Sequence, residues 1–335
     1  MTFRTTPGIT IAVSARRRVL GAGLASLALG TGCASSAPPA SAPSPTPTTT
    51  PTPAGSGLRD TGHAVALPDT HEFQMTSAGG RDYRILVAQP SGPVPQQGYG
   101  MLVVLDGNWM FGAAAQAMQL LMRFPDLGPG TPGHPKGGRA EPLLVVGIGY
   151  PGDDKRAWKE RTWDFLPAPH GPIEVQRARL LADPGGAEAF LDFLVDELRP
   201  ALAARYPLRP DRHTLSGASL GGYFTLHALA RRPQAFQRYA AISPSLWWDD
   251  RRLLAEMAQA RPAGGRVLLA LARDELPGYP DRSAGMLDGA RRMRELLIGH
   301  GYGAESLRYL EVENEDHMSI PFALTPTIVR FAAMP

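Results

Sequence analysis

From residue 58 onward, short apolar runs alternate along the chain with stretches in which apolar residues recur at helical spacing. The apolar runs predict strands at His71–Ser77, Arg81–Gln89, Tyr99–Leu105, Pro142–Tyr150, His213–Ser216, Tyr239–Ser243, Arg266–Ala272 and Leu307–Val312. Helical spacing predicts helices at Met110–Phe124, Ala187–Tyr206, Leu220–Arg231, Asp250–Gln259, Asp288–Gly299 and Pro321–Ala333. Strands that alternate with helices after an antiparallel start predict an α/β fold, with a central, mostly parallel sheet and helices on both faces.

Residues 1–33 predict an export signal that is not part of this fold. The run Arg16–Arg18 precedes an apolar stretch, Val19–Gly32, that is too short to span a bilayer as a helix. An arginine pair followed by Val-Leu resembles a twin-arginine signal, which would carry an already folded domain across a membrane. We therefore expect a signal peptide over residues 1–33 and a mature protein that is periplasmic or held at the cell envelope.

Cys33, the only cysteine of the chain, ends this apolar stretch. Its context, Leu29–Ser36, resembles a bacterial lipobox, although Gly30 stands where a lipobox more often has leucine. We expect Cys33 to be acylated and to anchor the protein to a membrane; cleavage without a lipid is the alternative. Residues 34–57 are rich in Pro, Ser and Thr, and they predict a linker that tethers the domain at 58–335.

The charge balance argues against nucleic acid as a partner. Four of the 34 basic residues are arginines that precede Cys33, so the mature chain would carry 30 basic residues against 31 acidic ones. Basic residues are also scattered along the domain, which predicts no patch for a phosphate backbone. With one cysteine and no closely spaced histidines, the sequence predicts no intrachain disulfide, no metal site and no cofactor.

The segment Gly147–Gly152 matches the Gly-x-Gly-x-x-Gly pattern of dinucleotide-binding loops and follows a predicted strand. A dinucleotide-binding fold needs a helix to open at this loop. The run Pro151-Gly152-Asp153-Asp154 is expected to break the chain there instead. We therefore expect no bound nucleotide.

The segment His213–Gly222 runs from a predicted strand into a predicted helix and contains Gly217-x-Ser219-x-Gly221. This is the pattern of a nucleophile elbow, a turn so tight that the serine adopts strained dihedral angles and its hydroxyl projects above the sheet. Small residues two before and two after the serine are expected to prevent clashes. Ser219 is therefore the candidate nucleophile, and the nearby Ser216 is expected to be a buried hydroxyl.

A serine hydroxyl becomes a good nucleophile only when a base takes its proton. In a fold of this kind the base follows the last strand, and of the eight histidines only His317 does so. A carboxylate that orients the imidazole belongs after the strand Arg266–Ala272, where Glu275 is the first choice and Asp274 the second. Both could instead be solvated loop charges.

An oxyanion intermediate needs two backbone N–H donors. One is expected from Leu220, directly after the nucleophile, and the other from the loop Asp106–Trp109 after the third predicted strand. Asn108 is the expected second donor, and Gly107 allows the backbone to approach the substrate closely. Trp109, in the same loop, is a candidate for substrate contact.

Four segments in this order resemble the bacterial putative-esterase family, and most closely its enterobactin and salmochelin siderophore esterases: Leu105–Asn108, Arg161–Pro167, Gly217–Gly222 and Ser243–Trp248. The resemblance covers roughly residues 70–330. It implies an α/β-hydrolase fold in which Ser219 and His317 form the catalytic pair. Some members rely on a Ser-His dyad, so a dyad without an acid stays open here. One departure is Ala218, where relatives usually carry histidine.

The resemblance also implies candidate substrate contacts. Arg161 and Asp164 match a family motif on a loop over the site, and the alternative is a mutual salt bridge that fixes this loop. Trp247 and Trp248 follow the sixth strand, where their ring faces would suit flat aryl groups. The alternative for at least one of the two tryptophans is packing in the core.

The sequence thus predicts an exported serine esterase that hydrolyses small-molecule carboxylic esters through an acyl-serine intermediate. Siderophore trilactones are the substrates that the resemblance implies. Two other functions stay open. An acyltransferase would use the same residues but deliver the acyl group to an alcohol, and a non-catalytic lipoprotein would use the fold to bind a ligand.

Overall fold

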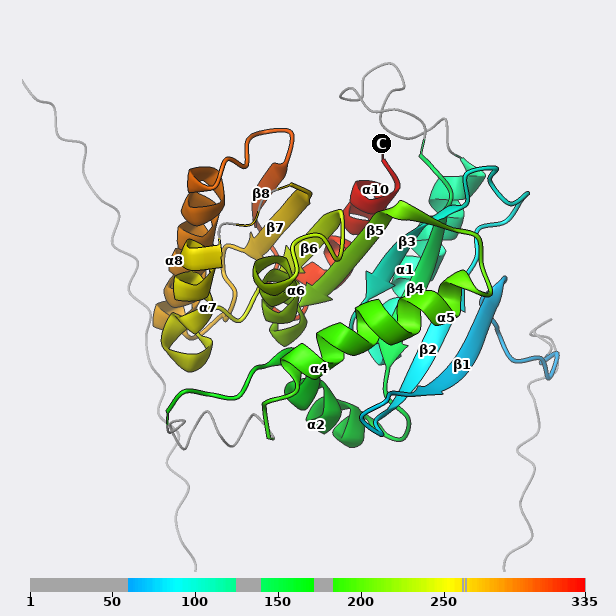
Figure 1. The fold of residues 1–335 in the computed structure, drawn as a ribbon, viewed down its shortest axis with the longest axis horizontal. Coiled ribbons are helices and arrows are strands. Elements are labelled where there is room, and N and C mark those ends of the chain that lie inside the picture. The colour runs from blue at the N-terminus through cyan, green and yellow to red at the C-terminus, as the bar shows by residue number, and fades with distance from the viewer. Residues whose placement is uncertain (1–59, 125–139, 172–182, 261, 263, 335) are drawn as a thin grey trace, which may run out of the picture. The chain divides into compact units, whose positions relative to one another are not determined.

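An eight-stranded sheet forms the centre of the domain (Figure 1). The structure is a computed structural model, and it describes residues 60–124, 140–171, 183–260, 262 and 264–334. The predicted signal peptide with Cys33 and the predicted linker at 34–57 lie outside the described residues. The chain divides into two units between His63 and Ala64, and every element named below belongs to the second unit.

The strands are β1 (Thr70–Thr76), β2 (Asp82–Ala88), β3 (Tyr99–Val104), β4 (Leu143–Gly149), β5 (Leu208–Ala218), β6 (Arg238–Ile242), β7 (Arg266–Ala272) and β8 (Leu307–Val312). Their order across the sheet is β1-β2-β4-β3-β5-β6-β7-β8. The pairs β1–β2 and β2–β4 are antiparallel, and the other neighbours are parallel. All the predicted strands are confirmed. β5 is longer than predicted because Leu208 already pairs with Tyr99, ahead of a shift in register.

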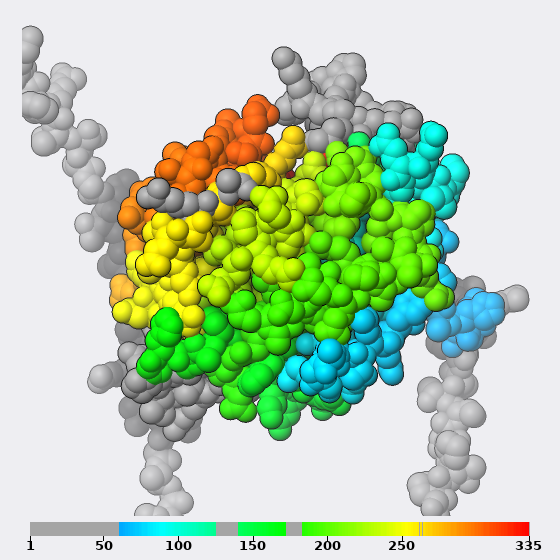
Figure 2. Space-filling view, viewed as in Figure 1, coloured from blue at the N-terminus to red at the C-terminus, as the bar shows by residue number. Residues whose placement is uncertain are grey.

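Helices cover both faces of the sheet, as predicted. One face carries α2 (Asp154–Phe165), α4 (Ala187–Asp192), the π-helical segment η2 (Phe193–Leu198), α5 (Arg199–Ala203), α6 (Leu220–Arg231), α7 (Trp248–Ala260) and α8 (Pro280–Gly299). Figure 2 shows how the side chains on this face hide the central strands from view. The other face carries α1 (Gly107–Arg123) and α10 (Thr325–Ala333), which follows α9 (Ile320–Ala323). Each face therefore has its own apolar core.

The helix predicted at Ala187–Tyr206 is observed as the continuous run α4, η2 and α5. Its predicted apolar stripe is buried: Phe190, Leu191, Leu194, Leu198, Leu202 and Tyr206. Burial of such a stripe against the sheet is what fixes the helix there. Within the described ranges, no helix is both long and apolar enough to cross a bilayer.

The segment after β4 corrects a prediction. A helix does open there, because α2 begins at Asp154 and the side chain of Asp153 caps it by accepting the N–H of Arg156 at 2.9 Å. Most of α2 is polar or charged, so apolar spacing does not reveal it. The break at Pro151-Gly152 is only a short turn.

Several helix boundaries also differ from the predictions. α1 begins at Gly107, three residues before Met110, and the run of α4, η2 and α5 ends at Ala203, three residues before Tyr206. α8 begins at Pro280 rather than at Asp288, since proline is well placed in the first turn of a helix. The last predicted helix is divided at Leu324 into α9 and α10. The apolar spacing thus locates both helical segments, but it reveals neither the first residue of α8 nor the division at Leu324.

Candidate active site

The nucleophile candidate lies on a strained turn between β5 and α6. Ser219 has φ 57° and ψ −117°, a conformation that costs free energy for any residue with a side chain. Backbone hydrogen bonds from β6 and the segment after it hold this conformation. The N–H of Ser219 donates to the carbonyl of Ile242 at 2.9 Å, and its carbonyl accepts the N–H of Ser245 at 3.1 Å. The serine is thus fixed at the carboxyl edge of the sheet.

The glycines around Ser219 are not equivalent. A Cβ atom on Gly217 would overlap the backbone of Gly221. A Cβ on Gly222 would lie 2.8 Å from the carbonyl oxygen of Ile242 and 3.0 Å from Cα of Pro244. A Cβ on Gly221 would meet nothing closer than 3.5 Å. Space therefore does not require a small residue two after the serine; of the two glycines that follow it, Gly222 is the one packed too closely for a side chain.

Ser219, His317 and Glu275 form one line of hydrogen bonds. Nε2 of His317 lies 2.9 Å from Oγ of Ser219, and Nδ1 of His317 lies 2.7 Å from Oε2 of Glu275. Glu275 is fully buried, whereas the His317 side chain is 19% exposed. The backbone N–H of His317 also donates to the carbonyl of Glu275 at 2.9 Å, which ties the two loops together.

The other candidate acid, Asp274, does not reach the imidazole in this arrangement. Its carboxylate accepts the hydroxyl of Ser283 on α8 at 3.2 Å. Glu275, in contrast, has every oxygen in use, because Oε1 accepts the hydroxyl of Ser243 at 2.6 Å and the N–H of Ala272 at 2.8 Å. The geometry favours Glu275 over Asp274 as the residue that orients His317.

The two candidate oxyanion donors begin helices on opposite faces of the sheet. Leu220 is the first residue of α6, and Gly107 and Asn108 are the first two of α1. First-turn N–H groups have no carbonyl partner within their own helix, so they are available to an anion. The side chain of Asn108 has a role that the sequence does not predict. It brackets the backbone of Tyr150, with Nδ2 donating at 3.0 Å and Oδ1 accepting at 2.7 Å.

The glycines of the dinucleotide-like pattern serve this bracket and the packing of α1. A Cβ on Gly149 would lie 2.5 Å from Oδ1 of Asn108, and one on Gly147 would lie 2.8 Å from Cβ of Phe111 in α1. Gly107 in turn needs to be a glycine because its Cβ would lie 2.8 Å from the backbone of β4. Close approach of α1 to β4 accounts for these glycines without a nucleotide.

A buried ion pair holds Asp106, the residue directly before α1. Arg161 donates from Nε to Oδ1 of Asp106 at 2.6 Å and from a terminal nitrogen to Oδ2 at 2.9 Å. Arg161 is 3% exposed and Asp106 is 7% exposed, so the guanidinium is not open to a ligand. Asp106 precedes α1 in the left-handed region, with φ 56°. The bidentate pair fixes that strained residue.

Arg161 and Asp164 therefore differ from their predicted arrangement. They lie on helix α2 rather than on a loop, and they do not pair with each other. Asp164 is fully buried, with the hydroxyl of Tyr83 at 3.2 Å and Nε of Arg81 at 3.3 Å. Desolvation raises the pKa of the Asp164 carboxyl to about 7.

The predicted aromatic contacts separate into two groups. Trp248 is 1% exposed and belongs to the core on the α6 face, so core packing describes it and substrate contact does not. Trp247 is half-buried and meets Trp248 edge to face at 6.3 Å between ring centroids. Trp109 is also half-buried; its indole N–H donates to Asp154 at 3.0 Å. Trp158, a residue that sequence reasoning missed, is half-exposed and lies 6.4 Å from Trp109.

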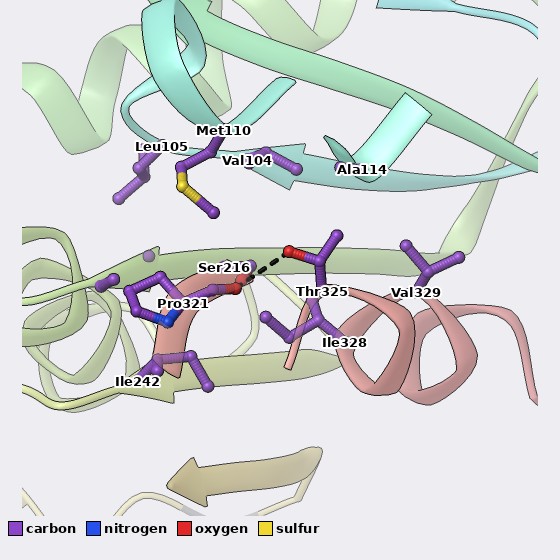
Figure 3. A pocket seen from close by; sticks show the side chains of 12 residues that line it. Val104, Leu105, Met110, Ala114, Ser216, Ile242, Pro321, Thr325, Ile328 and Val329 are labelled. Carbon is purple, nitrogen blue, oxygen red and sulfur yellow. Dashed lines mark hydrogen bonds between the residues drawn. The ribbon is translucent and has the colours of Figure 1, made fainter. Parts of the chain in front are cut away.

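A small apolar cavity lies behind the elbow, between β3, β5, α1 and α10 (Figure 3). Its volume is about 20 Å³, room for roughly one water molecule and not for an acyl chain. Ser216 lines this cavity and is buried, as expected of the serine that is not the nucleophile. The dashed bond in Figure 3 joins the hydroxyl of Thr325 to the carbonyl of Pro321, at 2.9 Å.

A mostly parallel sheet that presents an activated serine on such a turn defines the class: this is a serine hydrolase of the α/β-hydrolase fold. The chain belongs to the esterase family whose model, described as "Putative esterase", matches residues 76–298. The protein is therefore an ester hydrolase, in agreement with the resemblance seen in the sequence.

Relatives and solved structures support this assignment. The chain is 30% identical over 282 residues to ferri-bacillibactin esterase BesA of Bacillus subtilis (strain 168), with 82% of this chain and 93% of BesA covered. It is 33% identical over 207 residues to the siderophore triacetylfusarinine C esterase of Aspergillus fumigatus, with 57% and 61% covered. The crystal structure of the BES protein from Bacillus cereus matches with a TM-score of 0.68 at 26% identity, covering 81% of this chain and 98% of that one.

Proposed function

We propose that this protein is an exported esterase that cleaves siderophore esters through an acyl-serine intermediate on Ser219. The observation that carries the proposal is the unbroken line from Ser219 through His317 to the buried Glu275, with 2.9 and 2.7 Å between the heavy atoms. A serine, a base within hydrogen-bond distance and a group that orients the base are the parts that acyl transfer needs.

In the first half of the reaction, Nε2 of His317 takes the proton of Ser219 as Oγ bonds to the ester carbonyl carbon. The carbonyl oxygen becomes an oxyanion that accepts the first-turn N–H groups of Leu220 and Asn108. The intermediate collapses when the C–O bond to the leaving alcohol breaks and His317 gives its proton to that alcohol. Glu275 stabilises the imidazolium formed in between.

In the second half, a water molecule replaces the alcohol. His317 accepts a proton from the water as its oxygen bonds to the acyl carbon. The bond to Oγ of Ser219 then breaks, His317 returns the proton to Ser219, and the free acid leaves. Both halves need the neutral imidazole of His317, because only that form accepts a proton.

The proposed substrate class is supported by the relatives, whose names refer to bacillibactin and fusarinine siderophores. It is also supported by the aromatic pair Trp109 and Trp158 next to the start of α1, with ring centroids 6.4 Å apart and Trp158 half-exposed. Exposed aromatic rings suit contact with the flat aryl groups of catechol siderophores. Comparing kcat/KM for a catechol trilactone and for a simple aryl ester tests this; equal values for both would contradict a siderophore specificity.

Export and membrane attachment are proposals that rest on residues 1–33. The arginine run, the apolar stretch and the lipobox-like context of Cys33 support them. Mass spectrometry of the mature N-terminus from the membrane fraction tests both. An acylated Cys33 is expected, and an N-terminus without acyl mass would contradict the anchor.

A fluorophosphonate tests the reaction itself, because it reacts readily only with an activated serine. The full-length protein, Ser219→Ala and the control Ser216→Ala are each treated, and any adduct is located by peptide mass spectrometry. We expect an adduct on Ser219 in the wild type and in Ser216→Ala, and none in Ser219→Ala. An unmodified wild type that is folded would overturn the proposal.

A further inference from the structure

The turn Ser243-Pro244-Ser245, directly after β6, contacts both ends of the hydrogen-bonded line. The hydroxyl of Ser243 lies 2.6 Å from Oε1 of Glu275. The hydroxyl of Ser245 lies 3.4 Å from Oγ of Ser219. Both serines are buried, with exposures of 1% and 2%, so water does not compete for these hydroxyls. One tripeptide therefore reaches the acid and the nucleophile at once.

The backbone of this turn is held rigidly. Ser243 has φ 43°, in the left-handed region, and its N–H donates to the carbonyl of Ala270 in β7 at 2.7 Å. The N–H of Ser245 donates to the carbonyl of Ser219 at 3.1 Å. A strained residue at a site, held by its neighbours, points to a requirement for its side-chain position.

The contacts of the Glu275 carboxylate determine which group donates in each hydrogen bond between Glu275, His317 and Ser219. Oε1 of Glu275 accepts two donors, Ser243 Oγ–H and the N–H of Ala272, which stabilises the ionised carboxylate. An ionised carboxylate only accepts, so Nδ1 of His317 must carry its proton and Nε2 must be the acceptor. The Ser219 hydroxyl then donates its single proton to Nε2.

Because the Ser219 proton is donated to His317, Ser219 Oγ can only accept in its contact with Ser245. The proton between the two serine oxygens belongs to Ser245. At 3.4 Å the bond is long in the resting site. A hydrogen bond to an oxygen that gains negative charge is shorter and about twice as strong as a neutral one. Donation by Ser245 thus strengthens as Ser219 transfers its proton to His317, which is when it lowers the barrier.

We propose that Ser245 donates a hydrogen bond to the nucleophile oxygen during proton transfer. We also propose that Ser243 is a positioning residue: by donating to Glu275 it keeps the proton of His317 on Nδ1, so that Nε2 can accept the proton of Ser219. Donation by Ser245 also assists the second half of the reaction, when Oγ of Ser219 leaves the acyl carbon carrying negative charge. The inference rests on the proposed function of Ser219.

Ser245→Ala and Ser245→Cys separate donation from packing. Cysteine fills nearly the same volume as serine but is a weak donor. We expect both variants to lower kcat about tenfold, without a matching change in KM, and to slow inactivation by the fluorophosphonate by the same factor. Ser245→Cys is expected to keep the wild-type melting temperature. Ser216→Ala, a buried serine behind the elbow, serves as the matched control.

Three outcomes decide against the role of Ser245. Unchanged kcat and inactivation rates would show that the 3.4 Å contact between Ser245 and Ser219 does not contribute to catalysis. A wild-type rate in Ser245→Cys beside a slow Ser245→Ala would reduce Ser245 to packing. A faster Ser245→Ala would mean that Ser245 competes with His317 for the Ser219 proton. In each case labelling of Ser219 in the wild type still supports the proposed esterase, so the two proposals fail separately.

Ser243→Ala tests the positioning role. Loss of a donor to the buried carboxylate is expected to lower kcat about ten- to a hundredfold. It should also shift the low-field proton resonance of the His317 Nδ1–H, which a change in packing elsewhere would not move. An unchanged resonance and an unchanged rate would overturn the role of Ser243.

Discussion

Glu275 places Oε2 2.7 Å from Nδ1 of His317, while the neighbouring carboxylate of Asp274 accepts a hydroxyl from α8 instead. Two acidic residues that are adjacent in the sequence are thus separated by the turn that follows β7. One is buried against the imidazole and the other belongs to the contact with a helix.

Glu275→Gln should lower kcat by about 10³- to 10⁴-fold. The amide oxygen would stay with the donors Ser243 and Ala272, which turns the NH₂ toward His317. Nδ1 would then have to accept, and the proton would sit on Nε2, where it blocks the base. Steady-state kinetics on an aryl ester measures the loss.

Asp274→Asn is the matched control for this prediction, since it changes a carboxylate one residue away. Its activity should remain close to that of the wild type. A large loss of activity in Asp274→Asn together with a small loss in Glu275→Gln would contradict this assignment and show that Asp274 is the acid.

Arg161→Lys should lower kcat about tenfold, although the charge is kept. Lysine cannot form the bidentate contact with Asp106, so the strained loop before α1 would lose its support and the Asn108 N–H would shift. KM should change less than kcat, because the oxyanion exists only after attack. Arg156→Lys, at an exposed position on the same helix, is the control, and equal effects in both variants would contradict this role.

Gly222→Ala should be more damaging than Gly221→Ala, although Gly221 and not Gly222 belongs to the motif Gly217-x-Ser219-x-Gly221. A Cβ at Gly222 would press on Ile242 and Pro244, whereas one at Gly221 meets only ordinary contacts. We expect Gly222→Ala to lose stability and activity, and Gly221→Ala to keep both close to wild type. Thermal unfolding and esterase assays decide, and a folded, fully active Gly222→Ala would show that the segment after β6 can move aside.

Asp164→Asn should change how stability depends on pH. The folded-state pKa of Asp164 is raised to about 7 from 3.8, so between these values the folded protein holds a proton that the unfolded chain releases. Raising the pH through this window therefore favours unfolding, by up to about 1.4 kcal/mol for each pH unit. Denaturant unfolding of both proteins from pH 4 to 8 measures the difference.

Relative to Asp164→Asn, the wild type should lose free energy of unfolding as the pH rises toward 7 and then level off. A constant difference between the two proteins across this range would mean that Asp164 is already ionised at low pH, held by Arg81.

Much of the site follows from the sequence because it depends on local order. Ser219 sits at a strand end before a helix, and His317 and Glu275 each follow a strand. These positions need only the alternation of strands and helices. To choose between Glu275 and Asp274 as the acid, in contrast, requires the geometry of the turn after β7.

The supporting contacts could not be predicted in the same way. Asp106 and Arg161 are 55 residues apart, and Arg161 lies on a helix whose polar composition hides it. Ser243 and Ser245 belong to a segment that resembles the family, but nothing in their spacing shows that one faces the acid and the other the nucleophile. The role of Trp248 could not be predicted for a different reason. A tryptophan suits both a protein core and the wall of a binding site, and only the packing in the structure shows that Trp248 belongs to the core.

The helices α1 and α6 lie on opposite faces of the sheet, and the two proposed oxyanion donors, Asn108 and Leu220, belong to their first turns. Each amino end carries about half a unit of positive charge from its aligned peptide dipoles. The negative charge that grows on the carbonyl oxygen in the proposed reaction is therefore met by a field of main-chain groups, and side chains such as Arg161 act by holding those groups in place. A side chain at the rim that does not support this backbone can thus be exchanged to alter which ester is bound, and the main-chain donors stay in place.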